Sequence, residues 1–575
     1  MVKRPTAVHV VTTHRHHKGK TYHAHLLRRS YREGDTVKNE TLANLSHLPD
    51  QVVDLIRRSL RGERFVEAGE HFEIVRSQPH GDVQAVLTAM KALGFEGLLG
   101  SRPSRERSLV AAMVAARVLR PNSKLATTRW WDGTTLPGLM GVQGATEADL
   151  YGAMDWLFER QVTIEKKLAA RHLQQGGLVL YDLTSSYFEG THCPLAALGH
   201  SRDRKKGTLQ VNYGLVTDAL GCPVSVSVFP GNTNDSKTLM PTVKLVQSRF
   251  GIDRLVIVGD RGMITQKQLD QLEKDDRIDW VTALRSPAID DLVKQGQIQL
   301  GLFDERRLIE IQHPDHGRLV ACRNPDLAVL RTKKRQSLLQ ATDKLLQQIV
   351  RRVTAGRLRG ASEIGIAVGK VVNKFKVAKH FDIEITDQSL RCSINQQRVA
   401  SEAALDGIYV IRTSLTKDQM SAPAVVGSYK RLSNVERAFR SLKTVDLHVR
   451  PIFHWTENRV RAHIFLCMLA YYVQYHMQEA WRSLLFFDEE AWTKERVDPV
   501  APARRSKSAL AKAETKLTED GHRVHSFHTL LGSLAQIVRN DCRPRQDKEA
   551  QTFEVTTTPS SEQQKALDLL EAISA

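Results

Sequence analysis

Two aspartates follow short apolar stretches that are typical of buried β-strands. Asp182 comes directly after residues 178–181, and Asp260 comes directly after residues 254–259. If these strands lie side by side, the two carboxylates meet, and adjacent carboxylates repel each other unless a cation neutralises them. Oxygen ligands from Asp and Glu favour hard cations such as Mg²⁺ or Mn²⁺. A single aspartate at a strand end more often starts a turn, so a third acidic residue is needed to favour a metal site.

That third residue is Glu436, which lies in a segment with helical periodicity. Tyr429, Glu436 and Lys443 are seven residues apart, so they line one stripe of a helix predicted over residues 428–444. The neighbouring stripe is apolar and predicts a buried face: Leu432, Val435, Phe439 and Leu442. Glu436 is therefore predicted at the edge of a buried face. The alternative is a surface helix in which Glu436 pairs with Arg440, four residues later.

The surrounding pattern predicts an α/β core that positions these carboxylates. Alternating and continuous apolar stretches predict strands at residues 178–181, 209–217, 223–229 and 254–259. Residues 236–250 have helical period. Glu436 follows Asp260 after 175 intervening residues (436 − 260 − 1). Because a loop of that length is very uncommon inside a domain, we expect an inserted domain between them.

The region before this core is predicted to be helical. Ser104 is a candidate N-cap, Pro121 is a helix stop, and Thr146 with Asp149 has the pattern of a capping box. A helix, a short break and a basic helix are compatible with a DNA-binding helix-turn-helix. Ordinary helix packing explains the same pattern equally well.

In this order, the motifs resemble those of bacterial insertion-sequence transposases of the Asp-Asp-Glu (DDE) type. The closest resemblance is to the insertion-sequence-four superfamily, whose signature is Tyr-x2-Arg-x3-Glu-x6-Lys. Tyr429, Glu436 and Lys443 match this spacing, but position 432 is Leu where the signature has Arg. Arg431 and Arg440 are the candidates to replace it. Further matches are Asp260-Arg-Gly262, Tyr181-Asp182-Leu-Thr184 and Gly231-Asn232-x-x-Asp235.

The resemblance implies a fold class and a division of the chain. The fold would be α/β, a ribonuclease-H-like catalytic core interrupted by a mainly β insertion, with helical N-terminal and C-terminal regions. We expect six segments, which are a basic arm or hairpin (1–83), a helical DNA-binding region (84–175), the first part of the core (176–289), the insertion (290–405), the second part of the core (406–496), and a linker with a C-terminal helix (497–575).

The resemblance also implies a reaction and its cofactor. Two Mg²⁺ (or Mn²⁺) ions held by Asp182, Asp260 and Glu436 would promote hydrolysis at the ends of a mobile element. The freed 3′-OH would then attack target DNA and join the strands. Tyr429, Arg431, Arg440 and Lys443 would contact DNA near the cut. In the insertion, Lys333, Lys334 and Arg335 would help to hold the DNA end, although a solvated helix face is the competing explanation.

Charge and composition are consistent with a DNA partner. Lysine and arginine exceed aspartate and glutamate by 83 to 64, a net charge of +19, and such an excess favours binding to a polyanion. Residues 1–32 contain eight of these basic side chains and no acidic one. The partner would be double-stranded DNA, both the terminal inverted repeats and the target, and two protein copies would pair the ends as a dimer.

Other features limit the location of the protein and the metals that it binds. The longest apolar run, residues 464–473, is half of what a membrane span needs, and the basic N-terminus lacks a signal-peptide core. We therefore expect a cytoplasmic, nucleoid-associated bacterial protein without a membrane partner. The six cysteines form no Cys-x-x-Cys pair, which argues against disulfides and against a cysteine zinc site.

Four alternatives compete with transposition. A DNA-binding regulator without catalysis and a nuclease that only hydrolyses DNA remain open, and strand nicking and strand transfer would separate them. Residues 365–370 resemble a phosphate loop only superficially, because the motif is one residue short and Val371 follows it. Tyr429 as a recombinase nucleophile is disfavoured, since its place beside Glu436 suits a metal site better.

Overall fold

A computed structural model describes residues 8–17, 20–34, 36–63, 72–190, 192–203, 205–301, 303, 307–489, 500, 505–545 and 549–573. The chain divides into two compact units. The first contains residues 1–77 together with Arg539–Thr556, and the second contains Gln78–Val538 and Thr557–Ala575. None of the described helices is both long and apolar enough to cross a membrane.

The first unit is built mainly from antiparallel strands. β1 (Val8–His17), β2 (Lys20–Glu33) and β3 (Thr36–Asn44) form one sheet, followed by α1 (Asp50–Leu60). β1 and β2 pair from Val8 opposite Arg29 to His17 opposite Lys20, which confirms the predicted basic hairpin. A second sheet has the order β16 (Phe553–Thr556), β15 (Val538–Pro544), β4 (Phe72–Pro79).

The second unit begins with the predicted helical region. It comprises α2 (Gly81–Ala92), α3 (Phe95–Leu99), α4 (Arg105–Leu119), α5 (Lys124–Trp131), α6 (Leu136–Met140) and α7 (Glu147–His172). Local sequence sets the helix starts, because Ser104 accepts the Arg107 N–H and Thr146 forms a capping box with Asp149. Both predicted caps are confirmed.

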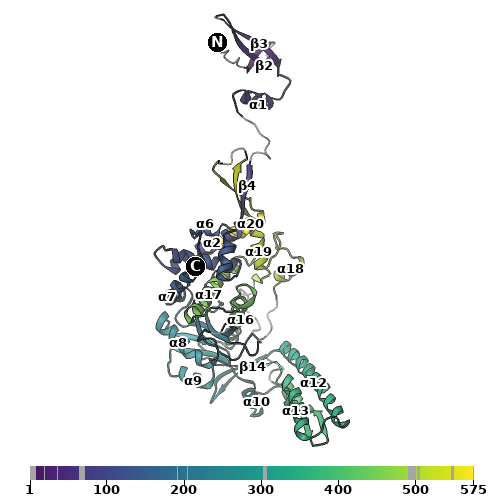
Figure 1. Ribbon diagram of the computed structural model, residues 1–575. Coiled ribbons are helices and arrows are strands. Elements are labelled where there is room, and N and C mark those ends of the chain that lie inside the picture. Colours follow the sequence, from purple (N-terminus) through teal and green to yellow (C-terminus); the bar gives the residue numbers. More distant parts are fainter. Residues whose placement is uncertain are drawn as a thin grey trace. The chain divides into compact units, whose positions relative to one another are not determined.

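An eight-stranded mixed sheet forms the centre of this unit (Figure 1). Its first five strands in chain order are β5 (Gly177–Tyr187), β6 (Gln210–Thr217), β7 (Pro223–Pro230), β8 (Leu255–Val258) and β9 (Ile278–Ala283). They lie side by side as β7-β6-β5-β8-β9. β6 is antiparallel to its neighbours, whereas β5, β8 and β9 are parallel. Numbered along the chain, these five strands have the order 3-2-1-4-5, in a mixed α/β unit.

Three further strands extend the sheet beyond β9. β14 (Ile408–Thr413), β11 (Gly317–Arg323) and β10 (Leu308–His313) follow in that spatial order, each antiparallel to the next. Helices α8 (Ser236–Phe250), α9 (Gln266–Leu272) and α10 (Ser286–Lys294) belong to the connections between the strands. The buried helix α17 (Glu457–Ala480) packs on α4, α7 and β7.

The prediction that the insertion is mainly β is wrong for the described residues. After β10 and β11 come α12 (Pro325–Thr354), α13 (Ala361–Phe375), a short hairpin of β12 (Phe381–Ile385) and β13 (Leu390–Ile394), and α14 (Gln396–Ala404). Figure 1 shows α12 and α13 side by side. Local pattern explains the helices, since Asn324 caps α12, Pro325 begins it, and apolar residues then recur at helical spacing.

These helices have an apolar core of their own, separate from that of the main sheet. Its buried members come from α12, α13 and the β12–β13 hairpin, and include Leu339, Leu346, Ile349, Ile364 and Leu390. A second small cluster lies under β10, β11 and β14. The region from 290 to 405 therefore contributes both an extension of the sheet and a helical subdomain.

The C-terminal region also differs in part from a wholly helical prediction. α18 (Lys507–Thr515), α19 (Phe527–Leu534) and α20 (Ser561–Glu571) are helices, but β15 and β16 interrupt them. α18 lies inside the segment that was expected to be a linker, whose residues 497–499 and 501–504 are outside the described ranges. A capping box made by Ser560 and Gln563 starts α20.

Candidate active site

Strand register places Asp182 and Asp260 at the same level of the sheet. β5 and β8 are parallel, and Leu180 pairs with Val258, so each aspartate lies two residues beyond that pair. Side chains two residues apart along a strand point to the same face. Asp182 does not end its strand as predicted, because β5 continues to Tyr187 while pairing with β6. Asp260 does follow the end of β8, and the Gly262 N–H donates to its Oδ2 at 3.4 Å.

A chain of helical turns brings Glu436 to the same strand. The predicted single helix consists of α15 (Ala422–Lys430), α16 (Leu432–Arg440) and a π-helical turn, η3 (Ser441–Val445). α16 packs on β5 through buried side chains that include Val435 and Phe439, and Glu436 is exposed beside them. The strongly amphipathic sequence of this helix explains why Glu436 lies at the edge of the buried face.

The negative charges of Asp260 and Glu436 act on Asp182. The pKa of Asp182 is raised to about 7, mainly by burial and also by these two charges. The Leu183 N–H, which donates to Oδ1 at 2.8 Å, and the Arg202 guanidinium oppose this increase. Three carboxylates in mutual repulsion are the arrangement that a divalent cation stabilises.

Tyr429 is a fourth member of this group. Its hydroxyl donates to Asp260 Oδ1 at 3.3 Å. Burial first, and then the charges of Asp260 and Glu436, raise the pKa of the Tyr429 phenol well above its usual range. The phenol therefore stays protonated at neutral pH and acts as a donor to the carboxylate, which is unlike an ionised nucleophile.

The donor set suits hard divalent ions. All three acidic side chains offer oxygen, the ligand that Mg²⁺ and Mn²⁺ prefer. Among the described residues, the three carboxylates do not form a group whose ligand atoms all lie within 4.8 Å of one another. One ion bound by all three would need a closer approach, whereas two ions roughly 3.5–4 Å apart are held by a wider set of carboxylates.

Comparison with known proteins decides the family. Residues 175–473 match the family described as transposase DDE domain, and residues 10–71 match the N-terminal domain of IS1634 family transposases. The first match covers 299 residues (473 − 175 + 1) of 575, more than half of the chain. The chain belongs to the transposase DDE domain family. The predicted insertion-sequence DDE transposase is confirmed, and with it an enzyme that binds DNA, cleaves it and transfers strands. Membership also implies dependence on divalent metal ions.

Comparisons with curated proteins and with solved structures give no further information about this transposase. None of the curated proteins matches the chain. Among solved structures, a piggyBac transposase in a synaptic complex with hairpin DNA, solved by cryo-EM, is similar with a TM-score of 0.33 and 10% sequence identity. That alignment covers 79% of this chain and 76% of the other. So low a TM-score supports no argument about this chain.

Lys443 of the transposase lies in a buried ion pair. Its Nζ is 3.0 Å from Asp203 Oδ1, and Arg450 pairs with the same carboxylate. The Tyr187 N–H donates to the other oxygen of Asp203 at 3.0 Å. Burial lowers the pKa of Lys443, and the Asp203 charge acts against that decrease. Lys443 therefore connects η3 to the segment between β5 and β6.

Sequence reasoning did not identify Arg202 as a residue of this site. Its guanidinium is 2.5 Å from Asp235 Oδ2, and its positive charge lowers the pKa of Asp182. Its backbone N–H donates to Ser185 Oγ at 3.0 Å, three residues past Asp182 along the strand. Two sequence features could have indicated Arg202, namely the concentration of basic residues at 202–206 and the Gly231-Asn232-x-x-Asp235 motif, which contains its partner Asp235.

The remaining predicted DNA contacts lie in different environments. Arg440 is exposed on α16, and Lys333 and Lys334 are exposed on α12. Arg431 joins α15 to α16 and is half-buried. Burial raises the pKa of Asp218, and the Arg431 charge opposes that increase.

Arg335 does not fit the prediction of a DNA contact. Its side chain is only 8% exposed, and it forms a two-point ion pair with Asp406. Thr332 donates to the same carboxylate at 2.9 Å. Because burial leaves the guanidinium inaccessible to a phosphate, Arg335 instead anchors α12 to the segment before β14.

Proposed function

We propose that this transposase belongs to the insertion-sequence-four superfamily and uses Asp182, Asp260 and Glu436 as its catalytic carboxylates. The observation that supports the assignment is the shared level of Asp182 and Asp260 on parallel strands, with the charge of Glu436 acting on Asp182. The enzyme would bind the terminal inverted repeats of its element, hydrolyse one strand at each end, and join the 3′-OH ends to target DNA.

Asp182, Asp260 and Glu436 would hold two Mg²⁺ or Mn²⁺ ions. When bound, such ions lower the pKa of a water nucleophile and stabilise the leaving oxygen of the phosphodiester. A bound ion would favour the charged form of Asp182, whose pKa is raised by burial and by the charges of Asp260 and Glu436. The Tyr429 hydroxyl, which donates to Asp260, would orient that carboxylate, and its phenol would lie beside the reacting phosphate.

The cationic residues near the carboxylates would position the DNA strand. Arg440 is exposed one turn after Glu436 and is available to a phosphate. Arg431 is the other candidate for the arginine that is absent at position 432. Lys443 would act mainly by holding the segment that follows β5, since its ammonium is already paired with Asp203. Phosphate contacts of this kind fix the register of the protein on DNA without reading sequence.

Two exposed regions would add sequence-independent affinity. Lys333 and Lys334 lie on the solvent-exposed side of α12, within the helical subdomain. The β1–β2 hairpin contains further basic residues and lies in the segment that matches transposase N-terminal domains. Neutralising phosphates with lysine and arginine releases counterions, which supplies most of the non-specific binding energy.

The wider organisation follows from the same proposal. The segments 1–83 and 84–175 would engage the element ends, 176–289 and 406–496 would form the catalytic core, 290–405 would hold the flanking DNA, and 497–575 would complete the C-terminal part. Pairing of two element ends would make the active complex a dimer, working in the bacterial cytoplasm on nucleoid DNA.

The test is cleavage and strand transfer with purified protein and the element's own ends. Asp182→Asn, Asp260→Asn and Glu436→Gln are each expected to abolish nicking in Mg²⁺ while end binding changes less than twofold. Ca²⁺ is expected to support binding without cleavage. Glu514→Gln, an exposed acidic residue on α18, serves as the matched control and should cut like wild type. A Glu436→Gln protein that still nicks would refute the assignment.

A supplied 3′-OH end distinguishes transposition from hydrolysis alone. Wild-type protein is expected to join a pre-cut end to plasmid DNA, and the three variants are not. If wild type nicks but never joins the supplied end, the superfamily assignment is wrong although the carboxylate assignment stands.

A further inference from the structure

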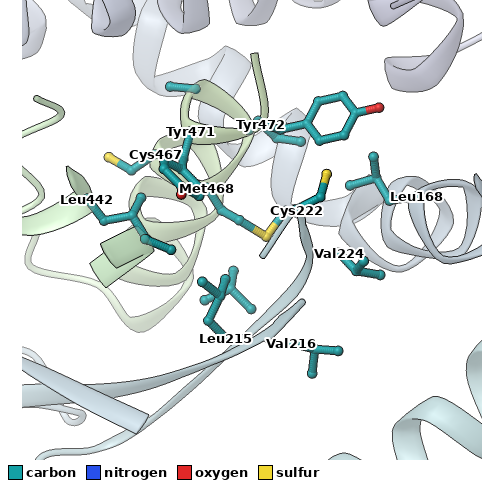
Figure 2. Packing of buried hydrophobic residues seen from close by; sticks show 14 of the residues in the cluster. Leu168, Leu215, Val216, Cys222, Val224, Leu442, Cys467, Met468, Tyr471 and Tyr472 are labelled. Carbon is teal, nitrogen blue, oxygen red and sulfur yellow. The ribbon is translucent and has the colours of Figure 1, made fainter. Parts of the chain in front are cut away.

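Three potential metal ligands lie close together where α7, the turn before β7 and α17 meet. They are His172 at the end of α7, Cys222 just before β7, and His476 in α17. One ligand atom from each lies within 4.8 Å of the other two, and within the described parts of the chain this is the single group of three His, Cys, Asp or Glu residues with that property. Figure 2 shows Cys222 with Tyr472 and Leu168 around it.

The distances are close to those of a tetrahedral metal site. Cys222 Sγ lies 3.7 Å from His476 Nε2. For a tetrahedral Zn²⁺ with Zn–S of about 2.3 Å and Zn–N of about 2.0–2.1 Å, the sulfur and nitrogen are about 3.6 Å apart. The pair is therefore already spaced as two ligands of one ion, and a ligand atom of His172 lies within 4.8 Å of both.

The chemistry of these side chains favours a soft divalent ion. Neutral imidazole is a common metal ligand in proteins, and thiolate accompanies it in zinc sites. A thiol and two imidazoles select zinc over magnesium or calcium.

The surrounding charges also favour a cation here. The negative charges of Asp218 and Glu479 act on Cys222, and they would stabilise a cation bound there. The Asp218 carboxylate accepts the N–H groups of Leu220, Gly221 and Cys222 at 2.8–2.9 Å, so it fixes the turn that presents the sulfur.

Tyr472 contacts both histidines of this group. Its hydroxyl forms a 3.1 Å hydrogen bond with His172 Nε2, and its ring lies edge-on to His476 with centroids 4.7 Å apart. Hydrogen bonds to the ring nitrogens of metal-binding histidines commonly fix the ring orientation. A nearby pair makes the contrast clear, since Cys467 Sγ is 4.0 Å from His463 Nε2, which already bonds the Val449 carbonyl at 3.1 Å.

We propose that His172, Cys222 and His476 bind one Zn²⁺ ion, with water completing the tetrahedron. The ion would connect α7, the β6–β7 turn and α17, three elements that pack against one another. Its role would be structural, joining the helical region to the catalytic sheet. The proposal does not depend on the identity of the catalytic carboxylates.

The test measures metal content and a spectroscopic signature on the full-length protein. Protein purified from a zinc-supplemented culture is expected to contain about one zinc ion per chain, measured by inductively coupled plasma mass spectrometry. Replacing zinc with Co²⁺ should give a thiolate-to-cobalt charge-transfer band. Cys222→Ser and His476→Gln should lose the zinc, and Cys222→Ser should also lose the band. Cys467→Ser, the matched control, should keep both.

Thermal unfolding supplies a second measurement that does not require a variant. Removing zinc by chelation should lower the melting temperature of wild type, and Zn²⁺ but not Mg²⁺ should restore it. The same removal and addition of zinc should leave the melting temperature of Cys222→Ser unchanged. Wild type that contains no zinc, shows no charge-transfer band and melts identically with and without chelator would overturn the proposal. Zinc retained by Cys222→Ser at the wild-type level would do so too.

Discussion

Glu165 on α7 is a buried acidic residue whose protonation links pH to stability. It is only 1% exposed. Its Oε1 accepts the Gln161 side-chain amide at 2.8 Å and the Val226 N–H of strand β7 at 3.1 Å. Burial raises the pKa of Glu165 to about 7, and the two hydrogen bonds only partly oppose that increase. Replacing Glu165 with Gln retains an acceptor oxygen for both donors and removes the titration.

The size of the effect follows from the two protonation states. The ordinary pKa is 4.5 and the folded value is about 7, a difference of about 2.5 pH units, and at 1.36 kcal/mol per unit this equals about 3 kcal/mol. Because the folded protein binds this proton more tightly than the unfolded chain, the stabilisation is complete below pH 4.5. It is lost as the pH rises towards and through 7.

The measurement is urea unfolding of wild type and Glu165→Gln between pH 5 and pH 8. The free energy of unfolding of the variant should exceed that of wild type by less than about 1 kcal/mol near pH 5 and by about 3 kcal/mol near pH 8. Using the difference between the two proteins cancels every other titrating group. Glu159→Gln on the same helix is the control, since the Glu159 side chain is 73% exposed. Equal pH slopes for Glu165→Gln and wild type would refute the reasoning.

Two further predictions concern α12. Arg335→Ala leaves the buried Asp406 carboxylate without its cation and is expected to destabilise the helical subdomain by about 3–5 kcal/mol. Faster proteolysis within residues 325–405 would reveal this loss, whereas Lys334→Ala, at an exposed neighbouring position, should cost less than about 0.5 kcal/mol. Equal digestion of the two variants would contradict the anchoring role of Arg335. DNA binding should weaken steeply as the salt concentration rises. Replacing Lys333 and Lys334 by Ala should reduce the slope of the logarithm of the binding constant against the logarithm of salt concentration by about 0.9 per lost phosphate contact. An unchanged slope would exclude α12 from the DNA interface.

Local sequence predicted many elements of this fold correctly. Ser104 and Thr146 cap helices where their side-chain chemistry required it, and the apolar stretches before Asp182 and Asp260 are strands. Such features depend on neighbours within a few residues. The insertion shows the limit of resemblance, because its helical period was visible in the sequence while the related proteins suggested a β domain.

Side-chain partners far apart in the chain were beyond the reach of sequence patterns. Lys443 and Asp203 are 240 residues apart, and Arg335 and Asp406 are 71 apart. Both cations look like free DNA contacts in the sequence, yet each is buried against a carboxylate. Charge alone therefore overestimates the number of residues available to DNA.

Residue types and their spacing specify the chemical groups of this protein, namely acidic residues after apolar strands, a Glu on an amphipathic helix and a large basic excess. Folding in three dimensions determines which of these groups meet. Strand register put Asp182 level with Asp260, and helix packing brought His172 and His476 to Cys222 although the cysteine spacing had argued against a zinc site. The physical reason is that secondary structure arises from local periodicity, whereas ligand sets and ion pairs require distances across the fold that no local pattern encodes.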